Sequence, residues 1–101
     1  MSVLGKESVN RLFRAVLCLE TEEECRAFFE DVCTIKEILD MSQRLEAAAL
    51  LDRGENYHSI SEAIGISAGT ISRVRRCLDY GAGGYRLVLD RTAGGNDGGG
   101  A

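Results

Sequence analysis

Arginines and hydroxyl-bearing residues are concentrated in the stretch IGISAGTISRVRRCL, Ile64 to Leu78, in a chain whose formal charge is −4. No acidic residue occurs between Ile66 and Leu78. On one helix face such residues could bind DNA, because guanidinium groups neutralise phosphates, hydroxyl groups hydrogen-bond to phosphates or base edges, and small side chains permit close approach. The residues predicted to contact double-stranded DNA are His58, Ser59, Ser67, Ala68, Gly69, Thr70, Ser72, Arg73, Arg75 and Arg76.

Two short helices joined by a tight turn are predicted to position these residues. The segment 57–64 predicts a two-turn helix, Gly65 its left-handed stop, and Ser67 the cap of a second helix that runs to about Asp79. Such a pair is a helix-turn-helix, in which the second helix enters the major groove with its N-terminal residues leading. The residues predicted to pack the two helices together are β-branched: Ile60, Ile64, Ile66, Ile71 and Val74.

A protein partner for the same surface is the alternative to DNA, because helical hairpins with a solvated basic face are common. The basic stripe favours DNA, since the cores of protein contacts are depleted in charge. The overall acidity favours a dimeric interaction module. No combination of acid, base and nucleophile can be named, so the sequence does not predict an enzyme.

The rest of the chain predicts an all-α domain, because the apolar residues recur at helical spacing. One amphipathic helix covers about Lys6 to Leu19, and capping boxes that start at Thr21 and Thr34 begin the next two helices. The third helix runs to about Arg53, and a short sixth helix covers 85–91. Because the third helix is apolar on most sides near its end, we expect a second copy of the chain to cover it.

The domain is predicted to span residues 1–91, and the glycine-rich segment 92–101 is predicted to be a flexible tail. The chain has no long apolar segment and no signal peptide, so we expect a cytoplasmic protein without a membrane span. The cysteines form no C-x-x-C pair and accompany a single histidine, which favours buried free thiols over a metal site. These cysteines are Cys18, Cys25, Cys33 and Cys77.

The segment 33–81 resembles the Trp repressor superfamily, and the span from about Leu12 to Arg91 resembles its YerC/YecD branch. The stretches FFEDVCTIKEI, QRLEAA, TISRVRRCL and GGYRLVLDR carry the closer match. The resemblance implies a transcriptional repressor with six helices in each subunit of an intertwined homodimer. It also implies that a helix-turn-helix from each subunit binds operator DNA.

A tryptophan corepressor site is also implied by the resemblance, but only part of it matches. Here Val74 replaces a glycine that makes room for the indole ring, and Cys77 replaces the serine expected to bind the amino group. We therefore expect a regulator that uses neither tryptophan nor any other cofactor. The repressor's residue types recur at four further effector positions: Thr34, Arg44, Thr70 and Arg73.

Two DNA-binding positions also depart from the repressor. Asp79 stands at the end of the second motif helix where the repressor has a lysine, and Ser61 replaces a lysine on the first motif helix. Arg75 and Arg76 are expected to compensate from neighbouring turns. The operator sequence of the family therefore cannot be transferred to this chain.

Overall fold

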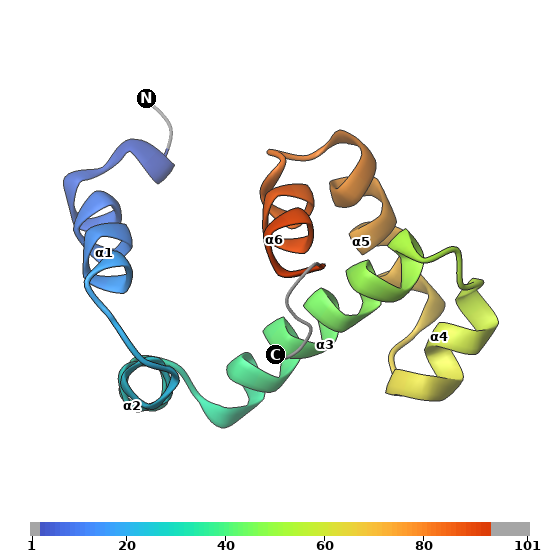
Figure 1. The fold of residues 1–101 in the computed structure, drawn as a ribbon, viewed down its shortest axis with the longest axis horizontal. Helices are drawn as coiled ribbons and strands as arrows, with labels where there is room; N and C mark the ends of the chain where they lie inside the picture. The colour runs from blue at the N-terminus through green and yellow to red at the C-terminus, as the bar shows by residue number, and fades with distance from the viewer. Residues whose placement is uncertain (1–2, 94–101) are drawn as a thin grey trace. The chain divides into compact units, whose positions relative to one another are not determined.

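A computed structural model describes residues 3–93 of the chain. In this part of the chain one short 3-10 turn precedes six α-helices, which confirms the predicted class and helix count (Figure 1). The elements are η1 (Val3–Gly5), α1 (Glu7–Leu17), α2 (Glu22–Val32), α3 (Ile35–Asp52), α4 (Tyr57–Ile64), α5 (Ala68–Tyr80) and α6 (Gly84–Ala93). Helix α6 includes Thr92 and Ala93, which we had assigned to the tail, and the remainder of that tail lies outside the described residues.

The helices form two compact units, Met1–Ile38 and Leu39–Ala101. In the first unit both predicted capping boxes begin helices. Thr34 accepts a hydrogen bond from the Glu37 backbone N–H at 3.1 Å, and the Glu37 carboxylate accepts one from the Thr34 N–H at 2.8 Å. Thr21 caps α2 in the same way at 3.0 Å, whereas the Glu24 carboxylate accepts from the N–H of Glu20 rather than from that of Thr21.

The helices of the first unit leave many of their large apolar side chains exposed. No residue of α1 or α2 is buried in the single chain. Leu17 is 82% exposed and Ile35 is 76% exposed, although both belong to the apolar pattern that predicts these helices. The amphipathic pattern therefore forms the expected helices without giving this unit a core of its own.

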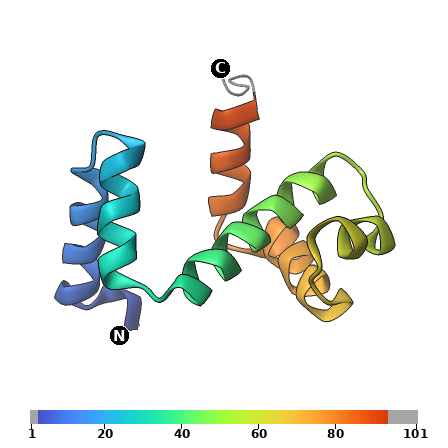
Figure 2. The ribbon, with the colours of Figure 1, turned by 90° about the horizontal axis from the view of Figure 1, so that it is seen from below.

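The second unit contains a hydrophobic core that joins α3, α4 and α5. Helix α3 contributes two alanines that are fully buried, and their side chains belong to one cluster with apolar side chains of the two later helices. Helix α4 follows the end of α3, and α5 returns beside α3 (Figures 1 and 2). The buried residues are Ala47, Ala48, Leu51, Ile60, Ile71, Val74 and Leu78.

The predicted packing residues of the helix pair lie in or beside this core. Ile60, Ile71 and Val74 are buried, as predicted, while Ile64 and Ile66 are partly buried and pack against the core from the turn. The prediction of buried thiols was wrong for the single chain. Cys18 and Cys77 are exposed, and the other two cysteines are only partly buried. Cys18 and Cys33 directly follow the ends of α1 and α2, in the unit that has no buried residue on those helices.

The described residues hold no group of three or more histidine, cysteine, aspartate or glutamate side chains that could bind a metal ion. In the same part of the chain, no helix is both long enough and apolar enough to span a membrane.

Candidate nucleic-acid interface

Helices α4 and α5 are joined by a tight turn whose geometry is fixed by backbone caps. Asn56 caps α4 by accepting a hydrogen bond from the Ser59 N–H at 2.8 Å. Gly65 ends α4 with φ 87°, in the left-handed region that glycine adopts without strain, and its N–H donates to the Ser61 carbonyl at 2.8 Å. Ser67 then caps α5, as predicted, by accepting from the Thr70 N–H at 3.2 Å.

A side-chain hydrogen bond also closes this turn. The Ser61 hydroxyl donates to the Ile66 carbonyl at 2.8 Å in a partly buried position. Neither Ser61 nor Asn56 was identified from the sequence as a residue that shapes the turn. Asn56 could have been found, because it is a preferred cap residue directly before the helical segment. The Ser61 contact could not, since it depends on how the chain folds back after Gly65.

One face of α5 carries an exposed stripe made of Gly69, Ser72, Arg73 and Arg76, at the spacing i, i+3, i+4 and i+7. It lies opposite the buried face of the same helix. All four residues are exposed, and neither arginine forms an ion pair with another described residue. Two unpaired guanidinium groups, a hydroxyl and a position without a side chain therefore share one surface, which we call the α5 stripe. A surface of this kind suits phosphate contacts with close approach to base edges.

Arg75 does not belong to this stripe, although the sequence grouped it with the other arginines. It lies on the flank of α5, where its Nε and Nη2 groups donate to the two carboxylate oxygens of Asp79 at 3.0 and 2.9 Å. This bidentate hydrogen bond raises the pKa of Arg75 and lowers the pKa of Asp79 from their ordinary values. Of the three arginines on α5, only two are therefore available without breaking an ion pair.

The remaining predicted DNA-contacting residues lie around the start of each motif helix. His58 is exposed on α4, with its Nε2 atom 3.4 Å from a carboxylate oxygen of Glu62. Ala68 is exposed in the first turn of α5. The hydroxyl groups of Ser67 and Thr70 lie 3.2 Å apart and hydrogen-bond to each other within the cap. Ser59 is partly buried.

The predicted effector residues have local structural roles or lie on the surface. Thr34 is the cap of α3 in the first unit, while Arg44 is partly buried on α3 in the second. Arg73 belongs to the α5 stripe. Val74 is only 2% exposed and forms part of the hydrophobic core, so its side chain fills space inside the second unit.

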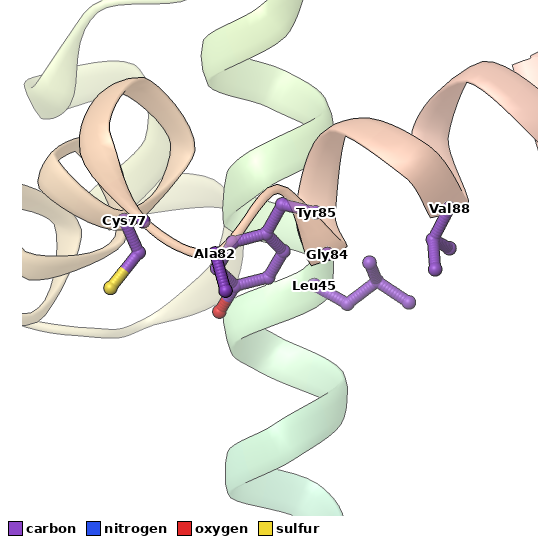
Figure 3. Close-up of a pocket in the computed structure, with 7 residues that line it drawn as sticks. Leu45, Cys77, Ala82, Gly84, Tyr85 and Val88 are labelled. Carbon is purple, nitrogen blue, oxygen red and sulfur yellow. The ribbon is translucent and has the colours of Figure 1, made fainter.

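Cys77 lines an apolar groove of about 500 Å³ between the last turn of α5 and the first turns of α6 (Figure 3). Leu45 contributes from α3, and Tyr85 and Val88 contribute from α6. None of the lining residues carries a charge, so the groove provides no partner for the carboxylate or ammonium group of an amino acid.

The fold and the α5 stripe together define an all-α helix-turn-helix protein. Residues 7–93 match the family described as Trp repressor protein, and the chain belongs to this family. It is 51% identical over 87 residues to protein YerC of Bacillus subtilis (strain 168), whose function is uncharacterized; the match covers 86% of this chain and 83% of that protein. The resemblance drawn from the sequence is thereby confirmed.

Two solved structures are also similar to this chain. A TrpR-like protein from Eubacterium eligens superposes with a TM-score of 0.87 at 47% identity, over 93% of this chain and 96% of that chain. A candidate Trp repressor from Staphylococcus aureus has a TM-score of 0.83 at 44% identity, over 87% of this chain and 88% of the other. These matches confirm that the six helices form a TrpR-like fold.

Proposed function

We propose that the protein is a sequence-specific, non-enzymatic DNA-binding regulator of transcription, and that it represses its targets as a homodimer. The observation that carries the proposal is the α5 stripe, which presents two unpaired arginines beside small and hydroxyl-bearing residues on the second helix of a helix-turn-helix. Membership of the Trp repressor family supports the same function. The proposed target is double-stranded DNA, and we also propose that the protein acts in the cytoplasm.

The geometry of α5 suggests a role for each residue of the stripe. Gly69 and Ser72 lie nearer the N-terminal end of the helix, which leads into the major groove in proteins of this kind. The absent side chain at Gly69 allows the backbone to approach a base edge. Arg73 and Arg76 lie one turn further along, where they would neutralise phosphates on either side of the groove.

The uncovered apolar side chains of the first unit support an intertwined homodimer. Stable monomers rarely expose so many large apolar residues, and a second copy of the chain is the partner that a closed symmetric assembly provides. Five of these residues, all on or next to the first three helices, are Leu12, Phe13, Leu17, Val32 and Ile35, each at least 40% exposed. A two-fold dimer would present two α5 stripes to successive half-sites about one helical turn apart.

We also propose that binding does not require tryptophan. The side chain of Val74 occupies core space where the repressor has a glycine, and filling a site made for one ligand removes its affinity sharply. Cys77 provides only a weak hydrogen-bonding group in place of a serine. The polar residues that match the repressor have other uses, since Thr34 caps a helix and Arg73 is assigned to phosphate.

The test is a fluorescence-anisotropy titration of the full-length protein with a two-fold symmetric DNA site selected from a random library. Arg73→Gln and Arg76→Gln should each make the slope of log affinity against log salt shallower by about 1.8, because each removes one phosphate contact from both subunits of the dimer, at about 0.9 per contact. Arg91→Gln, which removes the same charge from α6, should leave the slope unchanged. Equal slopes for all four proteins, or no selected site, would contradict the proposal.

The formal charge of −4 is the observation that favours a protein partner instead. In that case the wild-type protein would bind no duplex at low salt. Arg73→Gln would then weaken a complex with another protein rather than with DNA.

A further inference from the structure

The ion pair between Arg75 and Asp79 lies on the flank of the helix that carries the α5 stripe. Both side chains remain partly open to solvent, at 39% and 38% exposure, so the pair is accessible to a competing anion. The carboxylate of Asp79 accepts two hydrogen bonds from one guanidinium group, which is the arrangement that two oxygens of a phosphate also offer to arginine. The Asp79 carboxylate therefore accepts the hydrogen bonds of the Arg75 guanidinium in the way that a phosphate of the DNA backbone would.

Local helix stability does not explain an acidic residue at this position. Asp79 lies in the last turn of α5, next to the final residue Tyr80, where the helix dipole disfavours a negative charge. In the pair, the basic residue precedes the acidic one by four positions, which is the less favourable order on a helix. Exposed pairs of this kind contribute little to stability.

A second ion pair in the same unit influences the pair of Arg75 and Asp79. Arg86 at the start of α6 donates a hydrogen bond to Asp52 at the end of α3 at 2.7 Å. Asp52 in turn attracts the guanidinium of Arg75, and Arg86 attracts the carboxylate of Asp79. Opposite charges therefore alternate across the ends of three helices in the second unit, and the hydrogen bond to Asp79 makes Arg75 part of this cluster.

We propose that Asp79 acts as an internal substitute for DNA phosphate: it keeps Arg75 paired, so that α5 contacts the DNA backbone through Arg73 and Arg76 alone. This inference rests on the proposed DNA-binding function and assigns Asp79 as a residue that sets how strongly α5 binds the DNA backbone. Binding to random DNA depends on phosphate neutralisation, whereas binding to a specific site also uses base contacts. Because a phosphate contact carries no sequence information, withholding one arginine lowers the affinity for random DNA and for the operator by about the same factor, and it makes both affinities less sensitive to salt.

The test compares three variants with the wild type on the selected site and on a random duplex of equal length. Asp79→Asn frees Arg75 and should steepen the salt slope by about 0.9 per subunit in contact with DNA. The ratio of its affinity to the affinity of the wild type should therefore be about 3.5-fold larger at 50 mM than at 200 mM salt for each added phosphate contact. The ratio of specific to random affinity should change little, because a phosphate contact strengthens binding to every sequence by about the same factor.

The charge-conserving double variant, Arg75→Gln with Asp79→Asn, removes the pair without changing net charge. It should match the wild type in slope and in affinity within about twofold, since neither protein uses residue 75 on DNA. Asp90→Asn controls for net charge, because Asp90 is an exposed carboxylate on α6 whose nearest cation, Arg86, is 4.0 Å away. This control should also match the wild type.

The results that would contradict the inference differ from the result that would contradict the proposed function. If the salt slope of the double variant is shallower than that of the wild type by about one phosphate contact per subunit, Arg75 already binds DNA and the inference is wrong. If Asp79→Asn matches the wild type, or if the double variant gains as much as Asp79→Asn, pairing is irrelevant and the inference is again wrong. If the wild type shows no salt-dependent DNA binding, the proposed function itself fails. Should Asp79→Asn fail to fold by circular dichroism, the comparison of the double variant with the wild type still decides the matter.

Discussion

Val74→Ala is the perturbation whose outcome the structure specifies most fully. The side chain is 2% exposed and packs in the core that joins α3, α4 and α5. Replacing valine by alanine removes two methyl groups from this core, which costs about 1.6 kcal/mol of transfer free energy. The cavity left behind adds to that loss, so the free energy of unfolding should fall by about 2 kcal/mol or somewhat more.

The assay is urea unfolding followed by circular dichroism at one fixed protomer concentration, because the stability of a dimer depends on concentration. Ser72→Ala is the matched control: it lies two residues earlier on the exposed face of the same helix and should change the free energy of unfolding by less than about 0.5 kcal/mol. A loss below about 0.5 kcal/mol for Val74→Ala would show that the side chain is not packed as described. Val74 would then no longer argue against a tryptophan site.

Four further outcomes are expected from thermal or chemical unfolding. Asn56→Ala should lower the free energy of unfolding by about 1 kcal/mol, because it removes the cap of α4. Gly65→Ala should lower it by about 1–2 kcal/mol through the positive φ alone, since nothing lies within 4 Å of the added Cβ. An unchanged free energy of unfolding in urea titrations would contradict the corresponding cap. Because pairing lowers the pKa of Asp79 in the folded state, the stability it adds is present above the ordinary value of 3.8 and is lost as the pH falls through the lowered pKa. The small difference in melting temperature that the pair produces between the wild type and Asp79→Asn should therefore be present at pH 7 and vanish in acid, and a pH-independent difference would exclude the ion pair as its cause. Millimolar tryptophan should leave the melting temperature of the wild type unchanged, and a saturable rise would show that a tryptophan site exists.

The helix pair could be predicted in detail because its signals are local. Gly65 adopts the left-handed conformation that its position after an apolar segment indicates, and Ser67 caps the next helix. The burial of Ile60 and Ile71 also follows from spacing, because residues that face a neighbouring helix must recur with its period.

Other features depend on what each side chain contacts across the fold, and the sequence does not encode these contacts locally. Arg75 lies within a run that looks uniformly basic, yet its place on the flank of α5 pairs it with Asp79. The prediction that the cysteines are buried relies on the average behaviour of this residue type. In the single chain, Cys18 and Cys77 are exposed. Period and composition predict a helix and its apolar face, but they do not predict which faces are covered.

The measurement that tests the central claim most directly is a titration of the isotopically labelled full-length protein with its selected DNA duplex, followed by backbone amide chemical shifts. The account predicts that the largest shifts map to the turn and the first three turns of α5, from Ser67 to Arg76, with the second set at the start of α4. The amides of α1 and α2 should move little. Shifts centred on α1 and α2, or no shifts at a salt concentration that favours binding, would contradict the claim that the α5 stripe binds DNA.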